Sequence, residues 1–137
     1  MESHFYPIHC ILALVCGVQG RHQEARRAAE QARSLAPGEP LCEGVLGWAL
    51  GLGGERAQAT AILDEALKRR RETYFPASMV SWIYVGLGDL NAAYLWAETA
   101  FEERDPRLLS FAASAPADPL RADLRFRELL RKIGLRD

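Results

Sequence analysis

An interval of 34 residues recurs along the chain and constrains its fold more than any other feature. Glycine recurs at this interval at Gly20, Gly54 and Gly88. Four further columns keep the same interval without a gap: Ala25, Ala59 and Ala93; Ala32, Ala66 and Ala100; Leu12, Leu46 and Val80; Ala13, Gly47 and Ser81. A period of about 34 residues is typical of arrays of helix–turn–helix units, which stack because no single unit can bury its own apolar face.

Each repeat divides at its glycine into an apolar segment and a charged segment. The apolar segments, residues 6–20, 40–54 and 74–88, contain a single carboxylate, Glu43, and no Lys or Arg. An apolar helix is covered on most sides, whereas a charged amphipathic helix keeps a face in solvent. The pattern therefore predicts an inner and an outer helix in each unit. The glycine is expected in the left-handed conformation that ends the inner helix, and Asp89 is expected to cap the third outer helix.

Small side chains in the outer helices indicate close helix crossings. The alanine columns at positions 25, 59 and 93 and at positions 32, 66 and 100 leave room for an inner helix to approach. A larger residue at Ala93 would overpack such a crossing, at a cost of roughly 1–3 kcal/mol.

Composition places the chain among ordinary globular domains. The 137 residues carry a net charge of −1, with 49% hydrophobic and 26% charged residues, so no global field attracts nucleic acid or a membrane. The length suits one domain, residues 1–137. Cys10, Cys16 and Cys42 lie in apolar stretches, which predicts reduced, buried thiols in a cytoplasmic protein. The apolar run near the N-terminus follows Glu2 and no Lys or Arg, a pattern that argues against a signal peptide.

In these columns the chain resembles the tetratricopeptide repeat (TPR). The matching residues are Leu12, Ala13, Gly20, Ala25, Ala32 and Pro37 in the first unit; Leu46, Gly47, Gly54, Ala59, Ala66 and Leu67 in the second; and Val80, Tyr84, Gly88, Ala93, Ala100 and Phe101 in the third. His9, Glu43 and Ala77 depart from the family's Trp column, and Arg71 and Asp105 depart from its Pro column. The resemblance implies an all-α, right-handed superhelix with repeats at about residues 6–39, 40–73 and 74–107, and C-terminal capping helices in residues 108–137.

The C-terminal segment resembles the closing segment of bacterial multidomain signalling proteins, in which TPR arrays follow a Ser/Thr kinase, an adenylate cyclase or a winged-helix regulator. The similarity lies in the run from Asp118 to Phe126, in which Leu124 replaces a proline. We expect a last helix that begins at Asp123 and ends at Gly134, with an apolar side formed by Leu124, Phe126, Leu129, Leu130 and Ile133. The first inner helix has no comparable polar cap, so that end is expected either to be truncated or to be covered by another chain.

In TPR proteins, the side of the inner helix away from the outer helix lines a concave groove that binds peptides. Helical spacing places Trp48 and Trp82, which are one repeat interval apart, side by side on that surface. The expected partner-binding residues are Leu14, Val18, Leu41, Trp48, Leu52, Phe75, Trp82 and Val85. The carboxylate-clamp version of the TPR fold uses Lys and Asn in this groove to hold acidic C-termini. Neither residue occupies these positions, so an apolar or aromatic ligand is expected, such as an amphipathic helix laid in the groove. The alternative is that the two indoles are buried, because the superhelix closes over them, because the C-terminal tail covers them, or through self-association.

The sequence therefore predicts a non-enzymatic module that binds a peptide or helix of a partner protein, without cofactor, metal, nucleic acid or membrane. A self-associating assembly element and a regulatory TPR fragment of a larger bacterial signalling enzyme are the alternatives. His4, His9, Cys10 and Cys16 cluster near the N-terminus, but their spacing fits no standard zinc pattern. Ser78 and Ser81 lack a base and an orienting acid, so no catalytic residue is expected.

Overall fold

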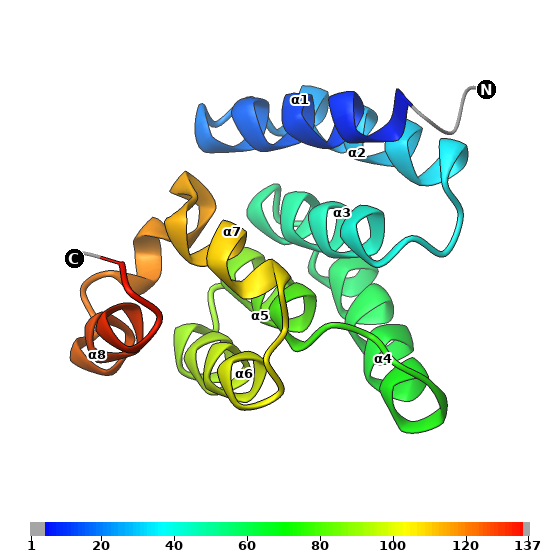
Figure 1. The fold of residues 1–137 in the computed structure, drawn as a ribbon. Helices are drawn as coiled ribbons and strands as arrows, with labels where there is room; N and C mark the ends of the chain where they lie inside the picture. The colour runs from blue at the N-terminus through cyan, green and yellow to red at the C-terminus, as the bar shows by residue number, and fades with distance from the viewer. Residues whose placement is uncertain (1–4, 136–137) are drawn as a thin grey trace.

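The computed structural model describes residues 5–135, and every regular element in that part of the chain is a helix (Figure 1). The all-α prediction is therefore confirmed. In chain order the elements are α1 (Tyr6–Val18), α2 (His22–Leu35), α3 (Pro40–Leu52), α4 (Arg56–Glu72), α5 (Ala77–Leu87), α6 (Leu90–Glu102), α7 (Arg107–Ala113), the 3-10 helix η2 (Ala115–Leu120) and α8 (Leu124–Lys132).

The first six helices form three consecutive hairpins, α1 with α2, α3 with α4, and α5 with α6. The predicted glycine terminators are confirmed, because Gly20, Gly54 and Gly88 have φ values of 80°, 84° and 81°. A residue with a β-carbon would be strained at these positions. Asp89 accepts a hydrogen bond from the backbone N–H of Ala92 at 3.1 Å, which confirms the predicted cap of α6.

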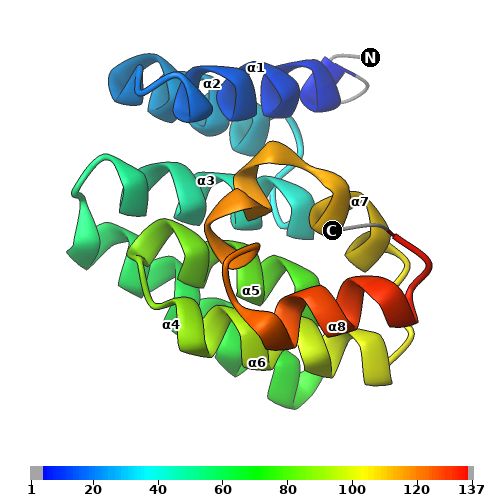
Figure 2. The ribbon, with the colours of Figure 1, turned by 90° about the vertical axis from the view of Figure 1, so that its left-hand side faces the viewer.

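The hairpins stack so that the apolar helices lie inside. Helix α3 packs against α1, α2, α4 and α5, and α5 packs in turn against α6, α7 and η2. Figure 2 shows α1 and α2 as the outermost layer above α3. The alanine columns of the outer helices are all buried, at 0–3% exposure. The prediction that these alanines mark close crossings is confirmed.

Glycines allow α3 and α5 to touch almost without intervening side chains. A β-carbon on Gly51 would lie 2.6 Å from the carbonyl carbon of Gly86, and one on Gly86 would overlap the backbone of Trp48. Gly44 and Gly47 leave room in the same way for Met79 and Ile83 of α5. The inner helices of the second and third hairpins are therefore locked together by backbone contact.

The C-terminal helices fold back over the third hairpin. Helices α7 and η2 pack on α5, and α8 packs on α6 (Figure 2). Asp123 accepts from the N–H of Arg125 at 2.8 Å and Gly134 has φ 87°, so the predicted start and stop of the last helix are confirmed. The prediction that Leu124 lies on the apolar side of α8 is wrong, because this side chain is 75% exposed. Phe126, also predicted on that side, is fully buried.

Asp105 joins two of these elements. Its carboxylate is buried at 5% exposure and accepts from the backbone N–H of Ser78, at the start of α5, and of Arg107, at the start of α7, both at 2.9 Å. Arg107 also forms an ion pair with Glu39, the N-terminal cap of α3, at 2.9 Å. The start of α7 is thus fixed against the amino ends of α3 and α5.

Candidate functional site

The two tryptophans predicted to line an open groove are buried within the chain. Trp48 is 1% exposed and Trp82 is 5% exposed. The expectation that their rings form an accessible apolar patch is therefore wrong, and the alternative of burial inside the chain describes them correctly.

Two different parts of the chain cover the rings. The indole of Trp48 occupies the space left by Gly17 of α1, where any β-carbon would overlap the ring. The ring of Trp82 packs against Phe111 of α7, with 5.3 Å between the ring centroids. Both indoles belong to the core because a neighbouring helix occupies the side on which a concave groove was expected.

The other expected binding residues differ in their exposure. Phe75 and Val85 are buried, at 1% and 4% exposure. Leu14, Leu41 and Leu52 are partly buried against the core, and only Val18 is largely exposed, at 52%. A binding role for these eight residues stays a prediction, but the structure does not bring them together on one open surface.

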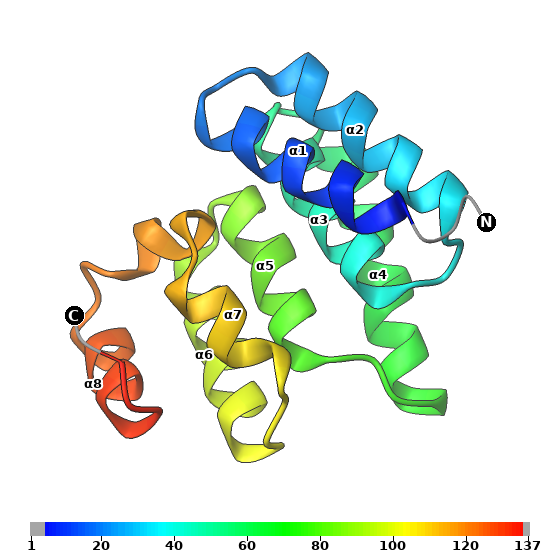
Figure 3. The same ribbon diagram turned by 45° about the horizontal axis from the view of Figure 1, so that its top comes forward.

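A different apolar surface is open on α1. We call it the α1 face, and its exposed residues are Phe5, Ile8, Ile11, Leu12, Val15 and Val18, at 47–62% exposure. The opposite side of the helix is buried, with Cys10, Ala13, Cys16 and Gly17 turned toward the core. Helix α1 lies at the top of the molecule in Figure 1, and in Figure 3 it lies toward the viewer, in front of α3. No Asp, Glu, Lys or Arg occurs between Phe5 and Gly20.

The equivalent columns in the later hairpins show what normally covers such a face. Met79 and Ile83 stand two repeat intervals after Ile11 and Val15, and they pack against Gly44 and Gly47 of the preceding inner helix.

Cys42, one repeat interval after Ile8, lies against the first hairpin in the same way. Its Sγ is 3.9 Å from that of Cys10 and 3.5 Å from the carbonyl oxygen of Ala32. The α1 face is thus the surface on which, elsewhere in this chain, a preceding hairpin packs. The absence of charge and of a polar cap was the sequence signal for this face, although Val18 is its one residue among the predicted groove residues.

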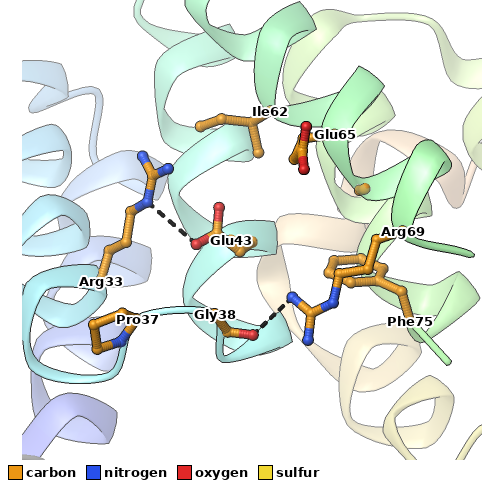
Figure 4. Close-up of a pocket in the computed structure, with 9 residues that line it drawn as sticks. Arg33, Pro37, Gly38, Glu43, Ile62, Glu65, Arg69 and Phe75 are labelled. Atoms are coloured by element: carbon orange, nitrogen blue, oxygen red, sulfur yellow. Dashed lines mark hydrogen bonds and ion pairs between the residues drawn. The ribbon is translucent and has the colours of Figure 1, made fainter. Parts of the chain in front are cut away.

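A hollow lies between α2 and α4, with α3 as its floor (Figure 4). It has a volume of about 310 Å³ and is lined by Arg33, Pro37, Gly38, Glu43, Ile62, Glu65, Ala66, Arg69 and Phe75. Arg33 pairs with Glu43 at 3.2 Å, and the guanidinium of Arg69 donates to the carbonyl oxygen of Gly38 at 2.7 Å.

The hollow offers little chemistry. Its lining contains no hydroxyl, thiol or imidazole, so it provides no nucleophile of these types. Three of its four charged side chains are already engaged within the chain, and Glu65 has no hydrogen-bond or ion-pair partner among the described residues. The 34-residue repeat gives little signal for this site, because Ala66 is the one lining residue that belongs to a recurring column.

The three cysteines and Ser81 are buried within the chain. All three thiols are free and buried, and the pKa of Cys42 is raised by its hydrogen bond to Cys10 and by burial. Ser81 donates to the carbonyl oxygen of Ala93 at 2.6 Å. His4 lies outside the described residues. Within residues 5–135 no group of three or more His, Cys, Asp and Glu side chains is arranged to hold a metal ion.

None of the helices described here has both the length and the apolar character needed to cross a bilayer. Comparison with known proteins gives no match, whether to a protein-family model, to a curated protein sequence or to a solved structure.

Proposed function

We propose that this protein is a non-enzymatic interaction module of the TPR type, a superhelix of three hairpins that binds a helix of a partner protein on the α1 face. The observation that carries the proposal is the exposure of six apolar side chains on α1 and its N-terminal cap residue, in a segment without Asp, Glu, Lys or Arg. The proposed ligand is an amphipathic helix, as expected from the sequence. The proposed binding surface is the α1 face instead of the tryptophan groove.

The size of this face supports a role in binding. Six side chains that are about half exposed present roughly 600 Å², which reaches the upper end of what a typical monomer leaves open. Isolated exposed apolar residues are common, but a contiguous uncharged stripe along a whole helix marks an interaction site. The columns of Ile11, Leu12 and Val15 are buried in α3 and α5, where other helices of this chain pack, so a helix is the natural occupant.

The burial of all three free thiols fits the cytoplasm, where thiols stay reduced. TPR identity, cytoplasmic location and bacterial origin are parts of the same proposal.

Site-specific photo-crosslinking tests the binding face. A photoreactive phenylalanine analogue at Ile11, which is 61% exposed, is expected to capture a protein in cells of the source organism. The same analogue at Leu95, a 46% exposed leucine on α6, is the matched control and is expected to capture none. Equal labelling at the two positions, or no protein adduct at Ile11, would contradict the proposal.

A further inference from the structure

We infer that the occupant of the α1 face is a second copy of this chain. The two α1 helices pack antiparallel about a two-fold axis that passes close to Ile11 and Leu12. This inference rests on the proposed function, since it names the partner for the same face.

The exposed residues of α1 form a pattern that reads the same in both directions. Phe5 and Val18, Ile8 and Val15, and Ile11 and Leu12 lie at equal distances on either side of one midpoint. An antiparallel copy placed about that midpoint therefore sets each exposed apolar residue opposite another. A two-fold interface requires such a self-complementary patch.

The charge of the face also suits a copy of itself. Two identical surfaces always bring like charges together near the axis, and such contacts are costly when they are buried. The segment from Phe5 to Gly20 carries no Asp, Glu, Lys or Arg. Two α1 faces can therefore meet without burying an ionic group.

Head-to-tail stacking is disfavoured by the other end of the molecule. Within the chain, an inner helix offers small residues to the next one: Gly44, Gly47 and Gly51 of α3 face α5. The equivalent positions of α5 are Ser78, Ser81 and Val85, and all three are buried. Helices α7 and η2 pack on α5, so a second molecule cannot extend the array there.

The area is enough for a modest dimer. Roughly 600 Å² from each copy gives about 1,200 Å² of buried surface, the lower limit for specific interfaces. Interfaces of this size are often of micromolar affinity. The dimer is therefore expected to dissociate on dilution.

Analytical ultracentrifugation over a concentration series tests the association. The wild-type chain is expected to approach twice its 15.3 kDa mass as concentration rises. Ile11→Asp is expected to stay monomeric with an unchanged helical circular dichroism spectrum, because Ile11 is 61% exposed in the isolated chain. Ile8→Asp, at a 62% exposed site, gives a second test if the first variant folds poorly. Leu95→Asp on α6 is the matched control and is expected to dimerise normally.

Engineered disulfides test the antiparallel arrangement. The native thiols are buried, so a cysteine introduced on the α1 face is the reactive one. Leu12→Cys, beside the axis, is expected to give a covalent dimer under mild oxidation. Val18→Cys is expected to give none, because two copies of that position lie about 20 Å apart along antiparallel helices at about 1.5 Å per residue. Efficient linkage at both positions would indicate parallel helices and overturn the arrangement.

The two proposals fail in different ways. A wild-type chain that is monomeric at every concentration overturns the inference of a second copy. If the Ile11 photoprobe then captures a different protein, the proposed function still stands. If it captures nothing, both proposals fail.

Discussion

At the scale of single residues, the tryptophans show what helical periodicity can and cannot predict. Spacing correctly places Trp48 on the side of α3 away from its outer helix. Spacing does not predict which element covers that side. In this structure Gly17 of α1 leaves space for the ring of Trp48, and Gly86 of α5 leaves space for its backbone. These two glycines belong to the first and third hairpins, whereas Trp48 belongs to the second. No local sequence pattern therefore links the glycines to the tryptophan.

Gly86→Ala tests the close crossing of α3 and α5. The added methyl group would overlap the backbone of Trp48, which cannot move aside as a side chain can. Overpacking should cost about 3 kcal/mol, and alanine's better helix propensity returns about 1 kcal/mol. We expect the free energy of unfolding, measured by urea denaturation, to fall by about 2 kcal/mol.

Gly44→Ala is the matched control for this crossing. Its methyl group would meet the flexible Met79, with the sulfur 3.0 Å away. We expect stability within about 1 kcal/mol of wild type, because small volume changes beside a methionine are tolerated. Equal losses in the two variants would show that backbone contact does not set the spacing of the helices.

At the scale of helices, the sequence predicts where a helix ends better than it predicts which other helices pack against it. The left-handed glycines and the caps at Asp89 and Asp123 are local features, and each is found where the sequence places it. The second role of Asp105, at the start of α5, depends on a fold-back across 27 residues and leaves no local trace. These helix ends were therefore predictable from the sequence, but the joint that Asp105 makes between α5 and α7 was not.

Asp105→Ala is expected to destabilise the protein more than loss of an ordinary cap. It removes the acceptor for two backbone N–H groups, one of them buried. The combined cost should be about 3 kcal/mol. Asp89→Ala removes an exposed cap with one acceptor contact and should cost about 1 kcal/mol. Thermal unfolding of the two variants gives the comparison, and a smaller loss for Asp105→Ala would contradict the bridging role.

At the scale of the whole molecule, the repeat predicted the three hairpins and their inner and outer helices. Five recurring columns carried that prediction, because stacked units must present the same small and apolar residues to their neighbours. The closing helices follow no repeat, so their path over Trp82 was not predictable from spacing. The candidate site was missed for a related reason: the columns of Ile11 and Val15 mark core positions in the later units and become surface only at the end of the stack.

The reactivity of the three buried thiols can measure local unfolding of the first hairpin. Cys10 and Cys16 lie on the buried side of α1, and Cys42 of α3 contacts Cys10. Opening of the first hairpin should therefore expose all three together. We expect slow reaction of the native protein with a thiol reagent at pH 8 and, in low denaturant, a single phase that counts three thiols. Rapid native labelling of any one cysteine would contradict this.

The glycine contact between α3 and α5 has a mechanical consequence. Where two backbones touch, a small rotation of one helix produces an immediate steric clash with the other. The joint between α1 and α3 contains instead the ring of Trp48, a side chain held against Gly17. Under a pulling force applied through both ends of the molecule, the array should therefore bend and yield first between its first and second hairpins, leaving the remainder as a stiff block.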